Sequence, residues 1–376
     1  MESQKIIFSD SSKIITEALA EAGADVFIGY PITPANLLYQ YASQRFPIFK
    51  AAPDEITTLQ WMSGFATAGK IPVTATSFPG YALMLEGINM AYMMELPMII
   101  ILVQRLGPAT GTATRGAQGD IALLSGTISG GMAIPSFSIS NQIDCWEISA
   151  KAVEVAVKYR TPVVIFTSKE EVMTMYSIDK NIFSPIKKVN QNFYDSEEEY
   201  IPYKAKENLV SEFLPLTSNK HQVRFTASTH DTHGIIQNSS KEALDNSKRL
   251  HYKITENLPD FTIYEYDKQE NADMLLLSFG ITSQAAREAV YDLRLEGKNI
   301  SLLIAKTLLP VPKEYYKICE KYKKVIIAEE NLSGQYRQLL FGSTPPEKIK
   351  GINEFGKMIS PVVIKKAILD YEQNIS

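Results

Sequence analysis

Residues 25–35 read DVFIGYPITPA, an apolar run of strand character followed at once by a turn with two prolines. Each proline fixes its own φ and moves the preceding residue out of the helical region, so the turn is stiff and extended. A stiff turn at the end of a strand holds the Thr33 hydroxyl in one position, as a ligand contact requires. The same residues fit a rigid connection between a strand and a helix, and the local pattern leaves both interpretations open.

Outward from this turn, residues 1–185 alternate strand-like apolar runs with segments of helical period. The expected strands are 25–28, 73–76, 98–103 and 163–167, and the expected helices include 54–68 and 143–159. This alternation predicts an α/β domain with a largely parallel sheet. Because the strands are nearly all apolar, we expect helices on both faces of that sheet.

The pattern changes in residues 186–270, which are polar and show little periodicity but keep their aromatic residues. We interpret this segment as a long connector with local structure. A second α/β unit follows in residues 271–376. Its expected strands are 274–278, 301–305 and 324–328, and its first helix is 283–296. No G-x-G-x-x-G follows any strand, so a Rossmann dinucleotide site has no support.

The composition is that of a globular protein, with 45% hydrophobic and 21% charged residues in 376. A net charge of −4 argues against a nucleic-acid-binding or anionic-membrane-binding surface. The longest apolar run, Leu96–Val103, contains Pro97 and is too short to span a bilayer. The first residues lack the basic and apolar regions of a secretory signal, so we expect a cytoplasmic protein.

Cys145 and Cys319 are the two cysteines, and neither lies in a C-x-x-C motif. An iron–sulfur cluster usually needs four thiolates, so the chain cannot supply a complete set. We therefore expect both to be small buried hydrophobic residues. His230 and His233 are three residues apart but lack further ligands at metal-site spacing, so no metal site is predicted.

Six ordered segments together resemble the 2-oxoacid:ferredoxin oxidoreductases, which are thiamine-diphosphate enzymes. They are YPITP at 30–34, APDEI at 52–56, TATSFPG at 74–80, QRLGPATG at 104–111, TRGAQGD at 114–120 and AEENLSGQ at 328–335. Their order and spacing are similar to those of the separate α subunit of the 2-oxoglutarate type, over nearly the whole chain. The resemblance implies a pyrimidine-type thiamine-diphosphate-binding domain in residues 1–185. It implies an α/β domain like the transketolase C-terminal domain in residues 271–376.

The resemblance makes Glu55 the catalytic carboxyl. Decarboxylation of a 2-oxoacid leaves a carbanion equivalent that thiamine diphosphate stabilises, and a carboxyl hydrogen-bonded to the cofactor's pyrimidine ring promotes the active tautomer. On spacing alone, Asp54 and Glu55 are equal candidates for the competing role of stabilising a helix N-terminus. The expected cofactor contacts are Tyr30, Pro31, Glu55, Ser77 and Gly80.

The resemblance implies that Arg105 receives the substrate carboxylate. Its place at the end of a parallel strand suits a ligand contact, and a guanidinium matches a carboxylate through two hydrogen bonds. An ordinary surface ion pair is the alternative for this arginine. By resemblance, Thr33 and Thr114 are neutral donors nearby. Arg115, the next residue, is assigned to the distal carboxylate of a dicarboxylic substrate.

The chain lacks the Gly-Asp-Gly stretch that holds the magnesium ion of the diphosphate in thiamine enzymes. Gly119-Asp120-Ile121 is the nearest approach and has no second glycine. The diphosphate anchor, Mg²⁺ and iron–sulfur cluster are therefore expected in partner subunits, above all a β subunit that shares the active site.

The predicted function is the α subunit of a 2-oxoacid:ferredoxin oxidoreductase that converts a 2-oxoacid, favoured as 2-oxoglutarate, and CoA to acyl-CoA, CO₂ and reduced ferredoxin. Phe78 and Leu106 depart from the small residues usual in the family and put the substrate's identity in question. They also leave open a non-catalytic subunit that stabilises such a complex. Another thiamine-dependent carboligase or transferase is a third possibility, which the missing diphosphate anchor disfavours.

Overall fold

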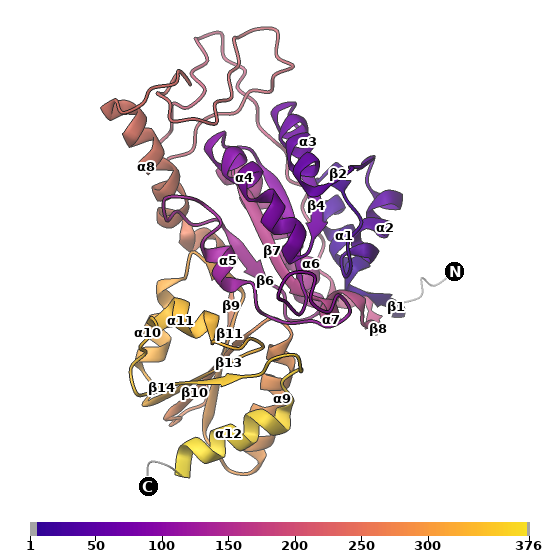
Figure 1. Ribbon diagram of the computed structural model, residues 1–376, viewed down its shortest axis with the longest axis vertical. Coiled ribbons are helices and arrows are strands. Elements are labelled where there is room, and N and C mark those ends of the chain that lie inside the picture. The colour runs from indigo at the N-terminus through magenta and orange to yellow at the C-terminus, as the bar shows by residue number, and fades with distance from the viewer. Residues whose placement is uncertain (1–5, 374–376) are drawn as a thin grey trace.

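The computed structural model describes residues 6–373, which fold around two mainly parallel sheets arranged along the long axis of the molecule (Figure 1). The strand order across the larger sheet is β12 (Thr307–Leu309), β6 (Ser136–Ser138), β7 (Pro162–Ser168), β5 (Met98–Gln104), β4 (Pro72–Thr76), β2 (Val26–Gly29) and β3 (Ile48–Ala51). Neighbouring strands are parallel except β12, which pairs antiparallel with β6.

The central strand β5 shows why these strands are apolar on both faces. Met98, Ile100 and Leu102 pack in the core under α3 (Glu55–Thr67) and α4 (Phe78–Met93). The alternate residues Ile99, Ile101 and Val103 pack under α1 (Ser11–Ala22) and α6 (Gln142–Tyr159). Successive strand residues point to opposite faces, so two helical layers require a continuous apolar strand.

The remaining elements of the N-terminal half are short. They are α2 (Asn36–Arg45), α5 (Ile121–Ser125), α7 (Lys169–Met173), η1 (Lys180–Ile182) and the antiparallel pair β1 (Ile6–Asp10) and β8 (Met175–Asp179).

The smaller sheet has the order β14 (Ile349–Asn353), β13 (Lys324–Glu329), β10 (Met274–Phe279), β11 (Ile300–Ala305) and β9 (Tyr264–Asp267), with β9 antiparallel. One face packs against α9 (Thr282–Leu295) and α12 (Pro361–Gln373). The other face packs with α10 (Lys313–Glu320) and α11 (Gln335–Phe341) in the same apolar core that holds α3 and α4. One core therefore joins the two halves of the molecule.

The predicted α/β class and its mainly parallel sheets are confirmed. Every strand and helix expected above is present, and each end differs by no more than one residue. Two elements cross the predicted divisions of the chain. Strand β9 lies within 186–270 but joins the smaller sheet, and β12 lies within 271–376 but joins the larger one. The exact division into domains stays a prediction.

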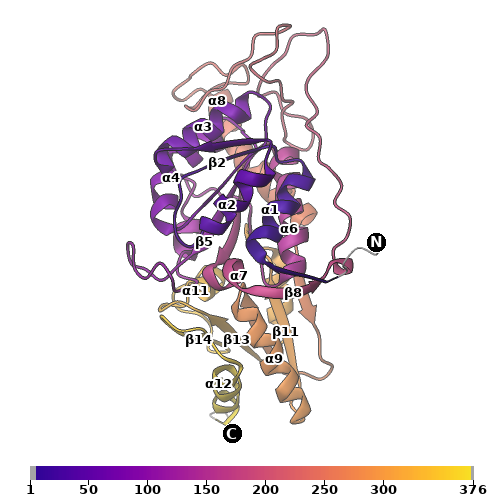
Figure 2. The same cartoon turned by 90° about the vertical axis from the view of Figure 1, so that its right-hand side faces the viewer.

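The connector forms loops at the end of the molecule farthest from the smaller sheet (Figures 1 and 2). Residues 186–239 contain only isolated bridges and turns, and α8 (Lys241–Glu256) and η2 (Leu258–Phe261) follow. Within residues 6–373, no helix is both long and apolar enough to cross a membrane.

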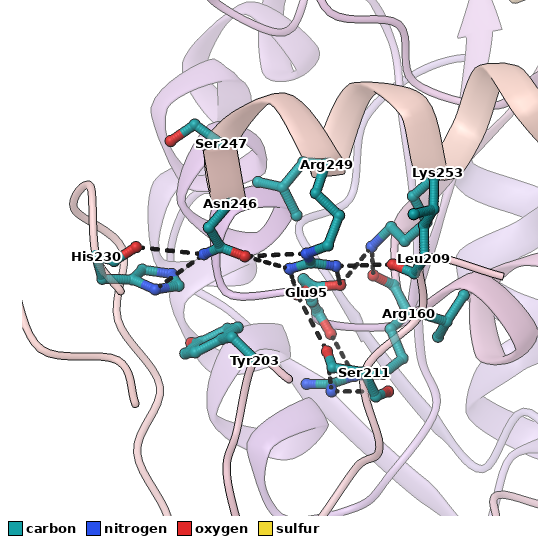
Figure 3. A network of polar contacts seen from close by, with 12 residues as sticks. Glu95, Arg160, Tyr203, Leu209, Ser211, His230, Asn246, Ser247, Arg249 and Lys253 are labelled. Atoms are coloured by element: carbon teal, nitrogen blue, oxygen red, sulfur yellow. Dashed lines mark hydrogen bonds and ion pairs between the residues drawn. The ribbon is translucent and has the colours of Figure 1, made fainter. Parts of the chain in front are cut away.

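A buried ionic network fixes α8 and the connector to the larger sheet (Figure 3). Glu95, fully buried after α4, accepts hydrogen bonds from Arg249 Nη1 at 3.1 Å and Lys253 Nζ at 2.7 Å. Arg160 Nη1 donates to Ser211 Oγ at 3.0 Å, and Ser211 Oγ donates to Glu95 Oε1 at 3.2 Å. Arg249 and Lys253, with the contribution of Arg160, lower the pKa of Glu95 against the opposing effect of burial, so the carboxylate is ionised.

Candidate active site

The two adjacent carboxylates at the start of helix α3 have different roles. Asp54 is the N-cap, and its Oδ1 accepts a hydrogen bond from the Thr57 N–H at 2.7 Å. The Thr57 bond lowers the pKa of Asp54. Asp54 therefore performs the capping role that the sequence left open between the two residues, and Glu55 is free for another role.

Glu55 is a buried carboxyl without a partner. Its side chain is 6% exposed, and it makes no hydrogen bond or ion pair with any residue in 6–373. Although the residue is buried as a whole, its carboxyl oxygens keep some exposure and are open to a bound molecule. The position therefore suits a carboxyl that bonds to a bound molecule.

Gly80, in the first turn of α4, makes room for this carboxyl. A Cβ at Gly80 would lie 2.5 Å from Glu55 Oε1 and 2.2 Å from Thr76 Oγ1, so any larger residue would displace these side chains. The neighbouring Ser77 is fully buried, and its Oγ has no hydrogen-bond partner among the described residues. The start of α3 thus carries an unpaired carboxyl next to Gly80, and the unpaired Ser77 hydroxyl lies three residues before that glycine. They fit the aminopyrimidine ring of thiamine diphosphate, which offers hydrogen-bonding nitrogens and a flat face.

Arg105 follows the end of β5 and lies against the turn at 29–35. Its Nη1 donates to the Thr33 carbonyl at 2.6 Å, and its Nε has no partner within residues 6–373. The side chain is 6% exposed, and burial lowers the pKa of the guanidinium while Asp120 opposes that shift. The structure therefore brings Thr33 and Arg105 together, and it rules out the surface ion pair considered as the alternative.

A cavity of about 330 Å³ opens beside Arg105, between the loops that follow β5 and β13. We call it the Arg105 cavity; the residues lining it include Phe78, Arg105, Leu106, Asp120, Glu330 and Phe355. Phe78 and Leu106, the two departures from the family pattern, therefore face the same space as the arginine. A pocket where two sheets' loops meet is a common place for a small-molecule site.

Asp120 and Glu330 are site residues that sequence reasoning missed. They are 6% and 4% exposed, and burial raises the pKa of each to about 7. Asp120 Oδ2 has no hydrogen-bond partner in the described chain, whereas Glu330 Oε1 accepts from the Ile359 N–H at 3.0 Å. The sequence signal for Asp120 was its place in the Gly119-Asp120 pair, which lies close to the Arg105 loop.

Gln118 and the 328–335 segment hold the two halves of the cavity together. The Gln118 N–H donates to the Glu330 carbonyl, and its Oε1 accepts from the Glu330 N–H, both at 2.9 Å. Asn331 Nδ2 donates to the Gln118 carbonyl at 3.1 Å, and Gln335 Nε2 donates to the Gly119 carbonyl at 2.8 Å. The C-terminal motif thus positions the cavity loop, a role that its sequence did not reveal.

Other predicted site residues lie away from the cavity lining. Thr114 and Arg115 are exposed, and Arg115 Nη1 donates to the Gly356 carbonyl. Tyr30 and Pro31 are also exposed at the turn. These assignments stay predictions, because an exposed side chain is free to meet a molecule or a subunit that docks there.

Among residues 6–373, no three His, Cys, Asp or Glu side chains are grouped so that they could hold a metal ion. Cys145 and Cys319 are buried and free, as predicted. Burial raises the pKa of the Cys319 thiol to about 12, so it is protonated at neutral pH.

The sequence matches the family described as pyruvate flavodoxin/ferredoxin oxidoreductase, thiamine diphosphate-binding, over residues 17–251. Residues 272–343 match the pyruvate:ferredoxin oxidoreductase core domain II. The first match alone covers more than half of the chain, which therefore belongs to this family of thiamine-diphosphate-binding oxidoreductases, as a subunit of the α type.

Individual relatives are distant but cover most of the chain. The 2-oxoglutarate synthase subunit KorA of Methanocaldococcus jannaschii is 26% identical over 97% of this chain and 100% of its own length. The ketoisovalerate oxidoreductase subunit VorB of Methanothermobacter thermautotrophicus is 28% identical over 89% of each chain. Relatives named for two different 2-oxoacids thus stand at similar identity, and identity alone does not choose the substrate.

Solved structures agree with the fold. The 2-oxoglutarate:ferredoxin oxidoreductase of Magnetococcus marinus, solved with 2-oxoglutarate, coenzyme A and succinyl-CoA bound, superposes with a TM-score of 0.91 at 26% identity. The match covers 98% of this chain and 66% of that one. A split-gene transketolase, at a TM-score of 0.55 and 15% identity, shows a likeness of fold alone.

Proposed function

We propose that this chain is the α subunit of a CoA-acylating 2-oxoacid:ferredoxin oxidoreductase and that a β subunit completes its active site. The proposed reaction converts a 2-oxoacid, CoA and two oxidised ferredoxins to an acyl-CoA, CO₂, two reduced ferredoxins and a proton. The observation that carries the proposal is the buried, partnerless Glu55 carboxyl beside Gly80. Family membership supplies the reaction class.

In this proposal, thiamine diphosphate supplies the electron sink that decarboxylation of a 2-oxoacid requires. Glu55 bonds to the pyrimidine ring and holds or releases a proton at its carboxyl oxygen. Ser77, Tyr30 and Pro31 line the same half-site, and Gly80 leaves the space that the Glu55 carboxyl occupies.

Arg105 binds the substrate carboxylate, with Thr33 and Thr114 as neutral donors. The bond from Arg105 Nη1 to the Thr33 carbonyl orients the guanidinium, and Nη2, which has no hydrogen-bond partner among residues 6–373, remains available to an anion. A charge-assisted contact of this kind contributes roughly 1.5–3 kcal/mol.

The partner subunits supply what this chain lacks. With two cysteines and no Gly-Asp-Gly, the chain does not provide the iron–sulfur cluster or the magnesium site of the diphosphate. Sequence resemblance and the relatives named for 2-oxoglutarate favour that substrate, whereas the walls of the Arg105 cavity favour an apolar one.

The test is to co-express the chain with its β subunit and to assay the purified complex with several 2-oxoacids, CoA and a viologen acceptor. CoA-dependent reduction by the complex, and by neither subunit alone, is the expected result. A stable complex that binds thiamine diphosphate but turns over no 2-oxoacid would instead identify a non-catalytic assembly subunit.

A further inference from the structure

The Arg105 cavity contains one cation and two acids. Arg105, Asp120 and Glu330 all line it, and each is at most 6% exposed. No other basic side chain lines the cavity within the described part of the chain. A carboxylate bound to Arg105 therefore uses the single positive charge that this chain provides there.

The rest of the wall is largely apolar. Phe78, Leu106, Pro108 and Ala117 line the cavity, with Leu332 and Phe355 beside them. Leu332 is 78% exposed and Phe355 52% exposed, so the apolar surface continues outward from the cavity. Asn331, Ser333 and Gln335 also line the cavity, but the side-chain amides of Asn331 and Gln335 donate to the backbone carbonyls of the 118–119 loop. The lining as a whole favours an apolar group that leaves water.

Arg115 does not supply a second positive charge to the cavity. Its Nη1 donates to the Gly356 carbonyl, and the residue is absent from the cavity lining. A second substrate carboxylate in this space would meet Asp120 and Glu330 instead of a cation, and like charges brought together disfavour binding.

On the basis of the proposed function, we propose that the substrate is a 2-oxoacid with an uncharged, apolar side chain and not the dicarboxylate 2-oxoglutarate. Arg105 binds the carboxylate next to the oxo group, and the side chain lies against Phe78 and Leu106. Asp120 and Glu330 act as specificity residues because they exclude a distal carboxylate.

Two matched substrates test this assignment on the reconstituted complex. 2-Oxopentanoate has the carbon count of 2-oxoglutarate but carries a methyl group in place of the distal carboxylate. At pH 8, we expect kcat/KM for 2-oxopentanoate to exceed that for 2-oxoglutarate by about tenfold or more. Equal or better use of 2-oxoglutarate would overturn the assignment and leave the proposed function standing. A complex that binds thiamine diphosphate but turns over neither acid, nor pyruvate or 2-oxoisovalerate, would contradict the proposed function itself.

The variant Asp120→Asn removes one acid at nearly constant size. We expect it to raise kcat/KM for 2-oxoglutarate relative to 2-oxopentanoate by about tenfold. The exposed Asp273→Asn is the matched control and should leave the ratio unchanged. An unchanged ratio in a folded Asp120→Asn complex would count against the assignment; if that variant fails to fold, the comparison of the two substrates on the wild-type complex decides.

Discussion

At the scale of single residues, the site depends on the absence of a side chain at Gly80. The Glu55 carboxyl occupies the space that any side chain at position 80 would take. A glycine in the first turn of a helix would otherwise only weaken that helix, so its presence is explained by the close approach of α3.

The variant Gly80→Ala should displace Glu55 and reduce both thiamine diphosphate binding and turnover of the complex. The new Cβ would lie 2.5 Å from Glu55 Oε1, closer than real contacts allow. Cofactor titration and the viologen assay measure the two effects.

Gly64→Ala is the matched control, since a Cβ at this exposed position in α3 meets nothing within 4 Å. It should preserve activity and stabilise the helix by about 0.8–1 kcal/mol. Normal cofactor affinity in Gly80→Ala would contradict the role given to the glycine.

The site residues also show what sequence reasoning reached. The turn at 29–35 and the start of α3 are local patterns, and the family resemblance singled out Thr33, Glu55 and Arg105 beside them; the roles of these residues stay predictions. Asp120 and Glu330 lie 210 residues apart in sequence and meet only because the loops after β5 and β13 face each other. Neither periodicity nor a short motif predicts that two residues so far apart in the sequence line one cavity.

At the scale of elements, strands and helices were predictable because their apolar periods are strong. The membership of β12 in the larger sheet was not predictable, because a three-residue strand carries too little pattern to show which sheet it joins. The place of α8 was equally hidden, since it depends on buried charges contributed by three distant segments.

We predict that Glu95→Gln destabilises the protein by about 3–5 kcal/mol, because it leaves buried cations without their carboxylate. Lys253 is 1% exposed and Arg249 10% exposed at the side chain, so water cannot replace the lost partner. Urea unfolding measures the change.

The control is Lys248→Ala on the same helix, where the side chain is 66% exposed and pairs with Asp245 at 3.4 Å. That change should cost less than about 1 kcal/mol. A Glu95→Gln protein as stable as this control would show that the network does not hold α8.

At the scale of the whole molecule, buried acids make stability depend on pH. Burial raises the pKa of Asp120 and Glu330 to about 7 and that of Glu171 to about 8. Between their ordinary and raised values, the folded protein holds more protons than the unfolded chain, so its stability falls as pH rises through this window.

We therefore expect the urea concentration at the unfolding midpoint to decrease as the pH is raised from 5.5 to 8. The variant Glu330→Gln should make this decrease smaller. Glu288→Gln, an exposed position on α9, should leave it unchanged. A urea midpoint that increases over this pH range would contradict the assignment of these protons to the buried acids. So would a pH dependence that is the same in wild type and Glu330→Gln.

The central claim is that Glu55 serves a thiamine-dependent oxidation shared with a β subunit. The most direct measurement compares CoA-dependent viologen reduction by complexes carrying wild-type chain, Glu55→Gln, or the exposed control Glu147→Gln on α6. We predict that Glu55→Gln assembles normally but turns over roughly 10²-fold or more slowly, the scale of lost acid–base assistance, while the control matches wild type. Near-normal turnover of an intact Glu55→Gln complex would contradict the account.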